Sequence, residues 1–271
     1  REPLRTAVMD PSLDGADRNR LTKFLLSIGA DPETFTTPRS KTLLSETENA
    51  TLVIRYFFDR ARSLHTLRKR RTMAKRLETI AKPIPEGSGL QLLPRLPEIF
   101  FTLVGQLPAA HIVFSKVSAW AFELVRKPRP LVLMFSGPSG HGKTELAEAM
   151  ALLLTGGRDH FKKVPCEQMR TVQEIFGSSG CFQGAEEGSE LNYFISEHDG
   201  KPAVVLFDEF EKADSDVSEY LLNIWDRGEL QDKKLRRGAS QTRRVDATRI
   251  LWIMTTNAFD HYVKDFARGR P

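Results

Sequence analysis

The 271-residue sequence predicts an α/β fold, a parallel sheet between helices, preceded by a small helical region. After the first 95 residues, three short apolar runs alternate with helical stretches, as they do in parallel sheets covered on both faces. The first 82 residues contain helix-like stretches but no such runs. A segment rich in proline and glycine is predicted as a linker over 83–95, which leaves 1–82 and 96–271 as domains.

The helical region begins with polar, loop-rich sequence, and helices are expected at Arg20–Ser27 and Ala50–Phe58. A basic helix is expected over 59–82, because apolar residues recur there at spacings of three and four. Its charges favour a solvated basic face or a regulatory helix that packs on a neighbouring subunit. A nucleic-acid interface is ranked lower, because no aromatic residues interleave the charges.

The second region is predicted to contain strands and helices in alternation. Strands are expected at Leu131–Phe135, Ala203–Phe207 and Ile250–Met254, where each apolar run ends in glycine or polar residues. Helices are expected at Glu98–Val125, Lys143–Leu154, Thr171–Phe176, Glu190–Ser196 and Val217–Asp226.

Composition excludes several classes of protein. With 40% hydrophobic and 28% charged residues, the chain is in the range of globular proteins and outside that of disordered ones. Its apolar runs are too short to span a bilayer, so no membrane partner is expected. Two cysteines form no disulfide framework and favour a reducing compartment, and we expect a mitochondrial or cytosolic location. Because the chain opens on Arg1, it is expected to be part of a longer protein.

The loop after the first predicted strand fits the pattern G-x-x-x-x-G-K-[ST] without a mismatch. Its glycines let backbone N–H groups point at a polyphosphate, and the following helix adds the positive end of its dipole. Lys143 is predicted to reach the β- and γ-phosphates, and Thr144 to offer a hydroxyl to Mg²⁺. The predicted nucleotide-binding residues are Gly137, Pro138, Ser139, Gly140, His141, Gly142, Lys143 and Thr144.

Polar residues also follow the other two predicted strands. Asp208 and Glu209 come directly after an apolar run, where uncompensated charges would be costly. Asp208 is predicted to hold Mg²⁺ through water, and Glu209 to activate the attacking water. The alternative is a strand that surfaces into solvent before the next helix. Asn257, after the last strand, is predicted to position the water near the γ-phosphate, the alternative being ordinary turn chemistry.

From about Leu96 onward the sequence resembles the Clp-type AAA+ ATPases, in particular the ATPase ring of ClpB-like disaggregases nearest their C-terminus. Five blocks occur in family order, at Leu103–Gln106, Gly137–Glu145, Leu206–Ala213, Leu221–Asp232 and Met254–Asn257. The first resembles a V-I-G-Q box that packs near adenine, which implies that Val104 and Gly105 bind nucleotide. The second, G-P-S-G-H-G-K-T-E, adds Glu145 to the nucleotide-binding residues.

This resemblance implies an AAA+ P-loop large subdomain that binds ATP and Mg²⁺, forms a homo-hexamer and couples ATP hydrolysis to the remodelling of unfolded or aggregated polypeptides. It also places Phe182 where the family has the tyrosine of its substrate-gripping loop, with Cys181 and Gln183 departing from the pattern. If the family resemblance is set aside, the sequence of this segment predicts an ordinary loop rich in glycine and serine. The stretch Lys233–Thr242 is longer and more basic than the family's hairpin.

The family's arginine finger and C-terminal lid lie beyond Pro271, so this stretch is expected to bind nucleotide more readily than it hydrolyses it. The alternative function is a nucleotide-gated, oligomerising signalling or scaffold module with little translocase activity. The hypothesis of a DNA-remodelling protein is supported by the basic segments alone and is ranked last. No nucleic-acid partner is expected.

The segment Leu25–Pro32 reads L-L-S-I-G-A-D-P and is similar to the end of an ankyrin repeat, so 20–58 is predicted as an ankyrin remnant. Such a repeat joined to this ATPase would resemble the animal mitochondrial ClpB homologue. A generic helix–loop–helix explains the same residues equally well.

Overall fold

The structure is a computed structural model that describes residues 3–32, 50–63, 67–82, 90–102, 105–124, 126–177, 189–231 and 243–269. Two compact units divide the chain. The first comprises 1–83 and 91–116, and the second comprises 84–90 and 117–271. The first unit therefore includes residues that follow the predicted linker, and helix α6 (Leu107–Glu123) contributes to both units.

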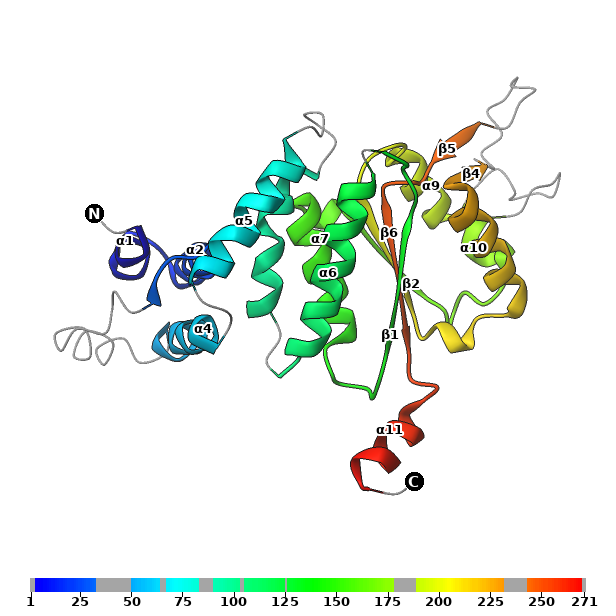
Figure 1. Cartoon of the computed structure of the whole chain (residues 1–271). Coiled ribbons are helices and arrows are strands. Elements are labelled where there is room, and N and C mark those ends of the chain that lie inside the picture. Colours follow the sequence, from blue (N-terminus) through cyan, green and yellow to red (C-terminus); the bar gives the residue numbers. More distant parts are fainter. Residues whose placement is uncertain are drawn as a thin grey trace. The chain divides into compact units, whose positions relative to one another are not determined.

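The first unit is helical (Figure 1). Its elements are α1 (Pro3–Met9), α2 (Gly15–Ser27), α4 (Ala50–Ser63), α5 (Leu67–Ala81), the 3₁₀ helix η2 (Leu90–Phe101) and the start of α6. Asp14 caps α2, because its carboxylate accepts the N–H of Asp17 at 2.7 Å. Leu26, on α2, and Phe57, on α4, are buried in the core of this unit. Among the helices described, none is both long and apolar enough to cross a membrane.

The basic helix predicted over 59–82 falls on the end of α4, which extends to Ser63, and on α5, which begins at Leu67. Residues 64–66 lie outside the described part, so a single helix there stays a prediction. The single helix predicted from Glu98 is wrong, because η2 extends to Phe101 and α6 begins at Leu107. The prolines at positions 94 and 97 lack the N–H groups that an α-helix uses, which explains the 3₁₀ geometry there.

The ankyrin interpretation stays a prediction. Within 20–58 the structure describes the end of α2 and the start of α4, and residues 33–49 lie outside the described part. A pair of packed helices is what both an ankyrin repeat and a generic helix–loop–helix would give.

The second unit is built around a four-stranded parallel sheet (Figure 1). Its strands are β1 (Leu131–Ser136), β2 (Phe161–Pro165), β3 (Ala203–Asp208) and β6 (Ile250–Thr256), in the order β1-β6-β3-β2. The helices are the end of α6, α7 (Lys143–Thr155), η3 (Arg158–His160), α8 (Val172–Phe176), α9 (Glu190–Glu197), η4 (Phe210–Lys212), α10 (Ser215–Arg227) and α11 (Asp260–Ala267). A short antiparallel pair joins β4 (Glu229–Gln231) to β5 (Arg244–Asp246). The α/β fold class is confirmed.

Helices cover both faces of this sheet, and the alternation of strand residues decides which side chain faces which layer. Phe207 and Trp252 lie in one core with residues of α8, α9 and α10, and their rings stack at 6.0 Å between centroids. Leu206 and Ile253, one residue along each strand, are buried on the opposite face, where α7 packs. The residues that end β3 and β6 on this second face therefore lie beside the start of α7.

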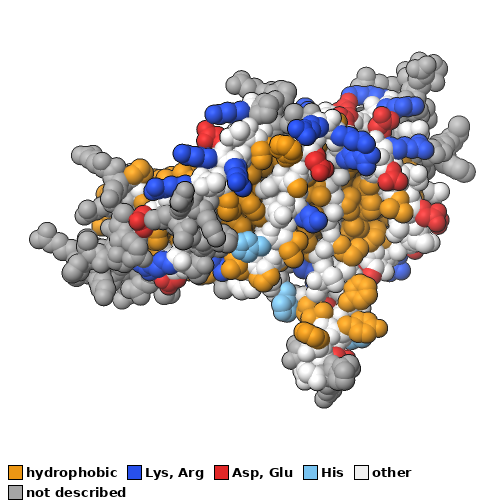
Figure 2. All heavy atoms as spheres, viewed as in Figure 1, with side chains coloured by type: hydrophobic (Ala, Val, Ile, Leu, Met, Phe, Trp, Pro, Cys, Tyr) orange, Lys and Arg blue, Asp and Glu red, His pale blue; other side chains and the backbone are white. Residues whose placement is uncertain are grey.

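The sequence prediction missed β2, β4, β5 and α11. The edge strand β2 carries Lys162 and Lys163, so it lacks the apolar run that marked the other strands. The basic stretch Lys233–Thr242 falls within 232–242, outside the described residues. Helix α11, which follows β6, exposes apolar side chains such as Tyr262 and Phe266, and Figure 2 shows hydrophobic side chains gathered there.

The turn after α10 requires a glycine. Gly228 has φ 68°, and its N–H donates to the Ile224 carbonyl at 2.7 Å. A Cβ atom at this position would lie 2.5 Å from Cγ2 of Thr248. We therefore expect Gly228→Ala to lower the free energy of unfolding of the second unit by about 2 kcal/mol.

Urea denaturation followed by tryptophan fluorescence tests this prediction, because all three tryptophans lie in the second unit. Gly157→Ala is the matched control, since Gly157 has φ −144° and its nearest atom would lie 3.7 Å from the new Cβ. Equal losses of stability in the two variants would contradict the prediction.

A buried histidine, His198 at the end of α9, contacts the partly exposed His160 before β2 and makes stability depend on pH. His198 is 7% exposed, with Nδ1 2.7 Å from the Phe194 carbonyl and Nε2 3.1 Å from Nδ1 of His160. Burial, assisted by the charges of His160 and Lys201, lowers the pKa of His198 despite the opposing effects of the Phe194 carbonyl and Glu197. The folded chain therefore binds this proton less readily than the unfolded chain, so stability falls as the pH drops below about 6.5.

We expect the urea midpoint of the second unit to be lower at pH 5 than at pH 7, and His198→Gln to reduce this difference. His261→Gln, at an exposed position on α11, is the control and should leave the difference unchanged. The same pH dependence in His198→Gln as in the wild type would contradict the assignment.

Candidate functional site

The predicted phosphate loop joins β1 to α7, at the edge where the parallel strands end. Gly140 and Gly142 have φ values of 77° and 78°, a left-handed conformation that favours glycine, and Gly142 is the N-cap of α7. The N–H of Gly137 donates to the Thr256 carbonyl at 3.3 Å, which ties the loop to the end of β6. The loop thus leads into the N-terminus of a 13-residue helix, where backbone N–H groups favour an anion.

Lys143 and Asn257 come together although 114 residues separate them. The Lys143 ammonium donates to the Asn257 side-chain oxygen at 2.7 Å and to the Pro138 carbonyl at 2.9 Å, and it also contacts the Gly137 carbonyl. The Lys143 ammonium therefore lies among the carbonyls of the phosphate loop, and the Asn257 side chain contacts it there. His141 is exposed beside them, with Nδ1 3.0 Å from the Ser139 carbonyl.

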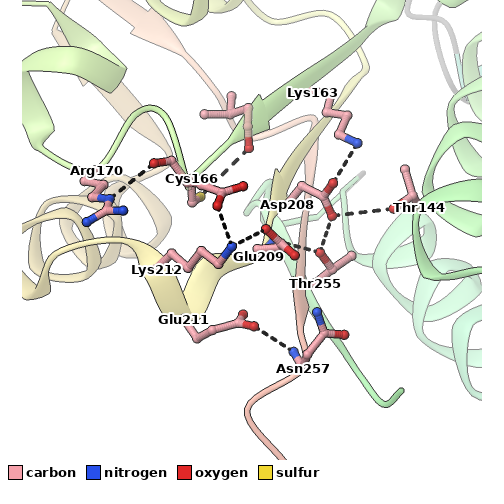
Figure 3. A network of polar contacts seen from close by, with 12 residues as sticks. Thr144, Lys163, Cys166, Arg170, Asp208, Glu209, Glu211, Lys212, Thr255 and Asn257 are labelled. Carbon is pink, nitrogen blue, oxygen red and sulfur yellow. Dashed lines mark hydrogen bonds and ion pairs between the residues drawn. The ribbon is translucent and has the colours of Figure 1, made fainter. Parts of the chain in front are cut away.

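Asp208 is surrounded by donors at the end of β3 (Figure 3). Its Oδ1 accepts the Thr255 hydroxyl at 2.6 Å and that of Thr144 at 3.5 Å, and Lys163 Nζ lies 2.6 Å from Oδ2. Burial opposes ionisation, but the hydrogen bonds and charge of Lys163, together with the two hydroxyls, outweigh it and lower the pKa of Asp208. The result is an ionised carboxylate beside a threonine hydroxyl, a set of oxygens that suits Mg²⁺.

Glu209 adopts an uncommon backbone conformation, with φ 57° and ψ 52°. Among the described residues it is the one non-glycine residue with positive φ. Its N–H donates to the Thr255 hydroxyl at 3.0 Å, and its Oε2 accepts the Lys212 ammonium at 2.9 Å. One buried hydroxyl, that of Thr255, thus positions both acids, by donating to Asp208 and accepting from Glu209.

A second carboxylate links the ends of β3 and β6. Glu211, on η4, accepts the backbone N–H of Asn257 at 3.0 Å. The predicted sensor position is therefore held at its backbone by Glu211 (Figure 3), and its side chain accepts the Lys143 ammonium.

Cys166 is a buried free cysteine next to this acidic cluster, and its N–H donates to the Asp208 carbonyl at 3.0 Å. Burial and the charges of Asp208, Glu211 and Glu209 raise the pKa of its thiol to about 12. The thiol therefore stays protonated at neutral pH and is not a reactive group of the site.

Not every predicted site residue can be located. Val104 and Phe182 lie outside the described residues, and Gly105, with φ 79°, belongs to the first unit. Glu145 is exposed in the first turn of α7. Sequence reasoning missed Thr255, Lys163, Glu211 and Lys212 as members of the site. A hydroxyl residue two positions before Asn257, at the end of a buried strand, was the available signal for Thr255.

Comparisons with known proteins agree with this geometry. Residues 129–269 match the AAA domain (Cdc48 subfamily). The chaperone protein ClpB of Chlamydia caviae is 36% identical over 186 residues, which cover 67% of this chain and 20% of that protein. ClpB 1 of Thermosynechococcus vestitus is 33% identical over 67% of this chain and 20% of its own length, and the chloroplastic ClpB2 of Oryza sativa is 32% identical over 61% and 16%.

The chain thus spans about a fifth of the length of the relatives that it matches first. The matched family covers the whole sheet and the loop between β1 and α7, where Lys143, Thr144, Asp208 and Asn257 meet. The chain therefore belongs to the AAA domain family (Cdc48 subfamily) and carries a Clp-type AAA+ ATPase domain.

Proposed function

We propose that this chain is the ATP-hydrolysing part of a protein-remodelling motor of the unfoldase or disaggregase type. The observation that carries the proposal is the meeting of four predicted residues at one end of the sheet. Lys143 lies 2.7 Å from Asn257, and Thr144 lies 3.5 Å from Asp208. A phosphate loop, a carboxylate for the metal and a polar sensor are the parts that nucleotide hydrolysis needs.

The residues present fit ATP and Mg²⁺. Left-handed glycines at the N-terminus of α7 and the ammonium of Lys143 suit the phosphates, and the oxygens of Thr144 and Asp208 suit the metal. When bound, the nucleotide supplies the phosphoanhydride bond, and Mg²⁺ supplies positive charge that offsets the phosphates.

The remaining roles fall to this chain's own side chains. Glu209 would orient a water and accept its proton, since its carboxylate is next to Asp208 in the sequence and is fixed by Lys212. Asn257 would place its side-chain amide beside the group that Lys143 neutralises. Thr255 fixes the backbone of Glu209 and the carboxylate of Asp208 through one hydroxyl.

Substrate and assembly are proposed from the relatives. Each is named a chaperone protein, which supports an unfolded or aggregated polypeptide as the substrate. Phe182 is the proposed gripping aromatic, and a homo-hexamer is the proposed assembly of the full-length protein.

Turnover of ATP by the full-length protein, with and without a permanently unfolded protein, tests the proposal. We expect turnover to rise on addition of the unfolded protein and not on addition of the same mass of a folded one. A heat-aggregated reporter enzyme should regain activity when ATP is present. Nucleotide binding without turnover that responds to substrate would overturn the proposed motor and leave a nucleotide-gated module.

A further inference from the structure

A partly exposed lysine near Glu209 has two carboxylate partners. The Lys212 ammonium lies 2.9 Å from Oε2 of Glu209 (Figure 3) and 3.0 Å from Oε1 of Glu167, which follows β2. All three side chains are more than a third exposed. Exposed ion pairs contribute little to stability, so folding alone does not explain this arrangement.

Glu209 needs such contacts, because its conformation is unfavourable. A non-glycine residue in the left-handed region costs about 1–2 kcal/mol, and it persists where surrounding contacts fix it. Three contacts do so here. The N–H of Glu209 donates to Thr255, its carbonyl accepts the N–H of Lys212 at 2.9 Å, and its carboxylate accepts the Lys212 ammonium. Two of the three contacts come from Lys212.

The turn of η4 explains why the Lys212 ammonium can reach the Glu209 carboxylate. Glu209 is the N-cap of this single 3₁₀ turn, and residues three apart lie above one another in such a turn. Glu167 holds the ammonium from the other side, and its own carbonyl accepts Nε of Arg170 at 3.2 Å. The hydrogen bonds to Glu209 and Glu167 also raise the pKa of Lys212, so the side chain stays charged.

We propose that Lys212 is a positioning residue for ATP hydrolysis, which fixes the carboxylate of Glu209, and that Glu167 acts through Lys212. This inference rests on the proposed function and adds residues that the phosphate-loop motif does not include. Lys212 touches neither the phosphate loop nor Asp208 in the contacts described, so it should affect the chemical step and leave nucleotide binding unchanged.

Steady-state ATP turnover by the full-length protein tests the inference, with nucleotide affinity and melting temperature measured in parallel. Lys212→Met keeps the backbone contact and removes the ammonium. We expect it to lower kcat about 10-fold, with KM, nucleotide affinity and melting temperature unchanged. Lys212→Arg should restore more than half of kcat. Lys162→Met removes another surface ion pair, that with Glu190, and should keep kcat within about 2-fold of wild type.

A double-mutant cycle tests the part of Glu167. Glu167→Gln should lower kcat less than Lys212→Met does, and it should have no further effect in the Lys212→Met background. If the Lys212→Met variant had the kcat of the wild type while the Glu209→Gln variant was inactive, the inference would be overturned and the proposed function would stand. A wild-type protein that binds ATP without turnover would instead overturn the proposed function. Additive losses in the cycle would overturn the role of Glu167.

Discussion

Replacing Glu209 by glutamine should reduce ATP turnover about 10³-fold and leave ATP binding intact. Glutamine keeps the size of the side chain and cannot accept the proton of the attacking water. The contacts that fix the backbone remain, since Thr255 accepts the N–H of Glu209 and the Lys212 N–H donates to its carbonyl. The variant should therefore fold as the wild type does and hold ATP without hydrolysing it.

Single-turnover hydrolysis and equilibrium ATP binding by the full-length protein measure this effect. Glu211→Gln is the matched control, because Glu211 lies two residues away and contacts the backbone of Asn257. We expect Glu211→Gln to reduce turnover far less than Glu209→Gln. Near-normal turnover in Glu209→Gln would show that another group activates the water.

The motif residues of the site could be predicted because each follows a recognisable local pattern. Lys143 and Thr144 belong to a loop whose glycines the backbone requires, and Asp208 and Asn257 end apolar strands. Parallel strands end at the same edge of a sheet, so the meeting of Lys143 with Asn257 follows from the order of the elements.

Other members of the site depend on register, which the sequence does not show. Lys163 pairs with Leu206 in the sheet, so it lies diagonally across from Asp208 on the same face. Because β2 is a short edge strand with two lysines, it has no apolar run that would have revealed it. The left-handed conformation of Glu209 is equally unpredictable, since residue preference alone favours glycine there.

The helix prediction from Glu98 is wrong for a different physical reason. One helix is predicted there, whereas the prolines before Glu98 favour the 3₁₀ geometry of η2 up to Phe101. A periodicity of three and four is common to both kinds of helix over a few residues, so it does not separate them.

Replacing Lys143 by methionine should weaken ATP binding at least about 100-fold, equivalent to about 2.8 kcal/mol. The ammonium is the one positive side chain that the described contacts place inside the phosphate loop, where it meets Gly137, Pro138 and Asn257. Methionine preserves the length and apolar stem of the side chain and removes its charge. Besides Mg²⁺, the negative charge of the phosphates would then be offset only by backbone N–H groups and the helix dipole.

Isothermal titration of the full-length protein with a slowly hydrolysed ATP analogue and Mg²⁺ would measure this loss. Asn257→Ala provides the contrast, because it removes the oxygen that accepts the ammonium and keeps the charge. We expect Asn257→Ala to change affinity less than about 5-fold and to lower turnover, since its proposed role is to place the water. If both variants lost affinity equally, the binding energy would arise from the hydrogen-bonded pair and not from the charge of Lys143. A Lys143→Met variant that binds as tightly as wild type would remove the phosphate loop from the proposed site.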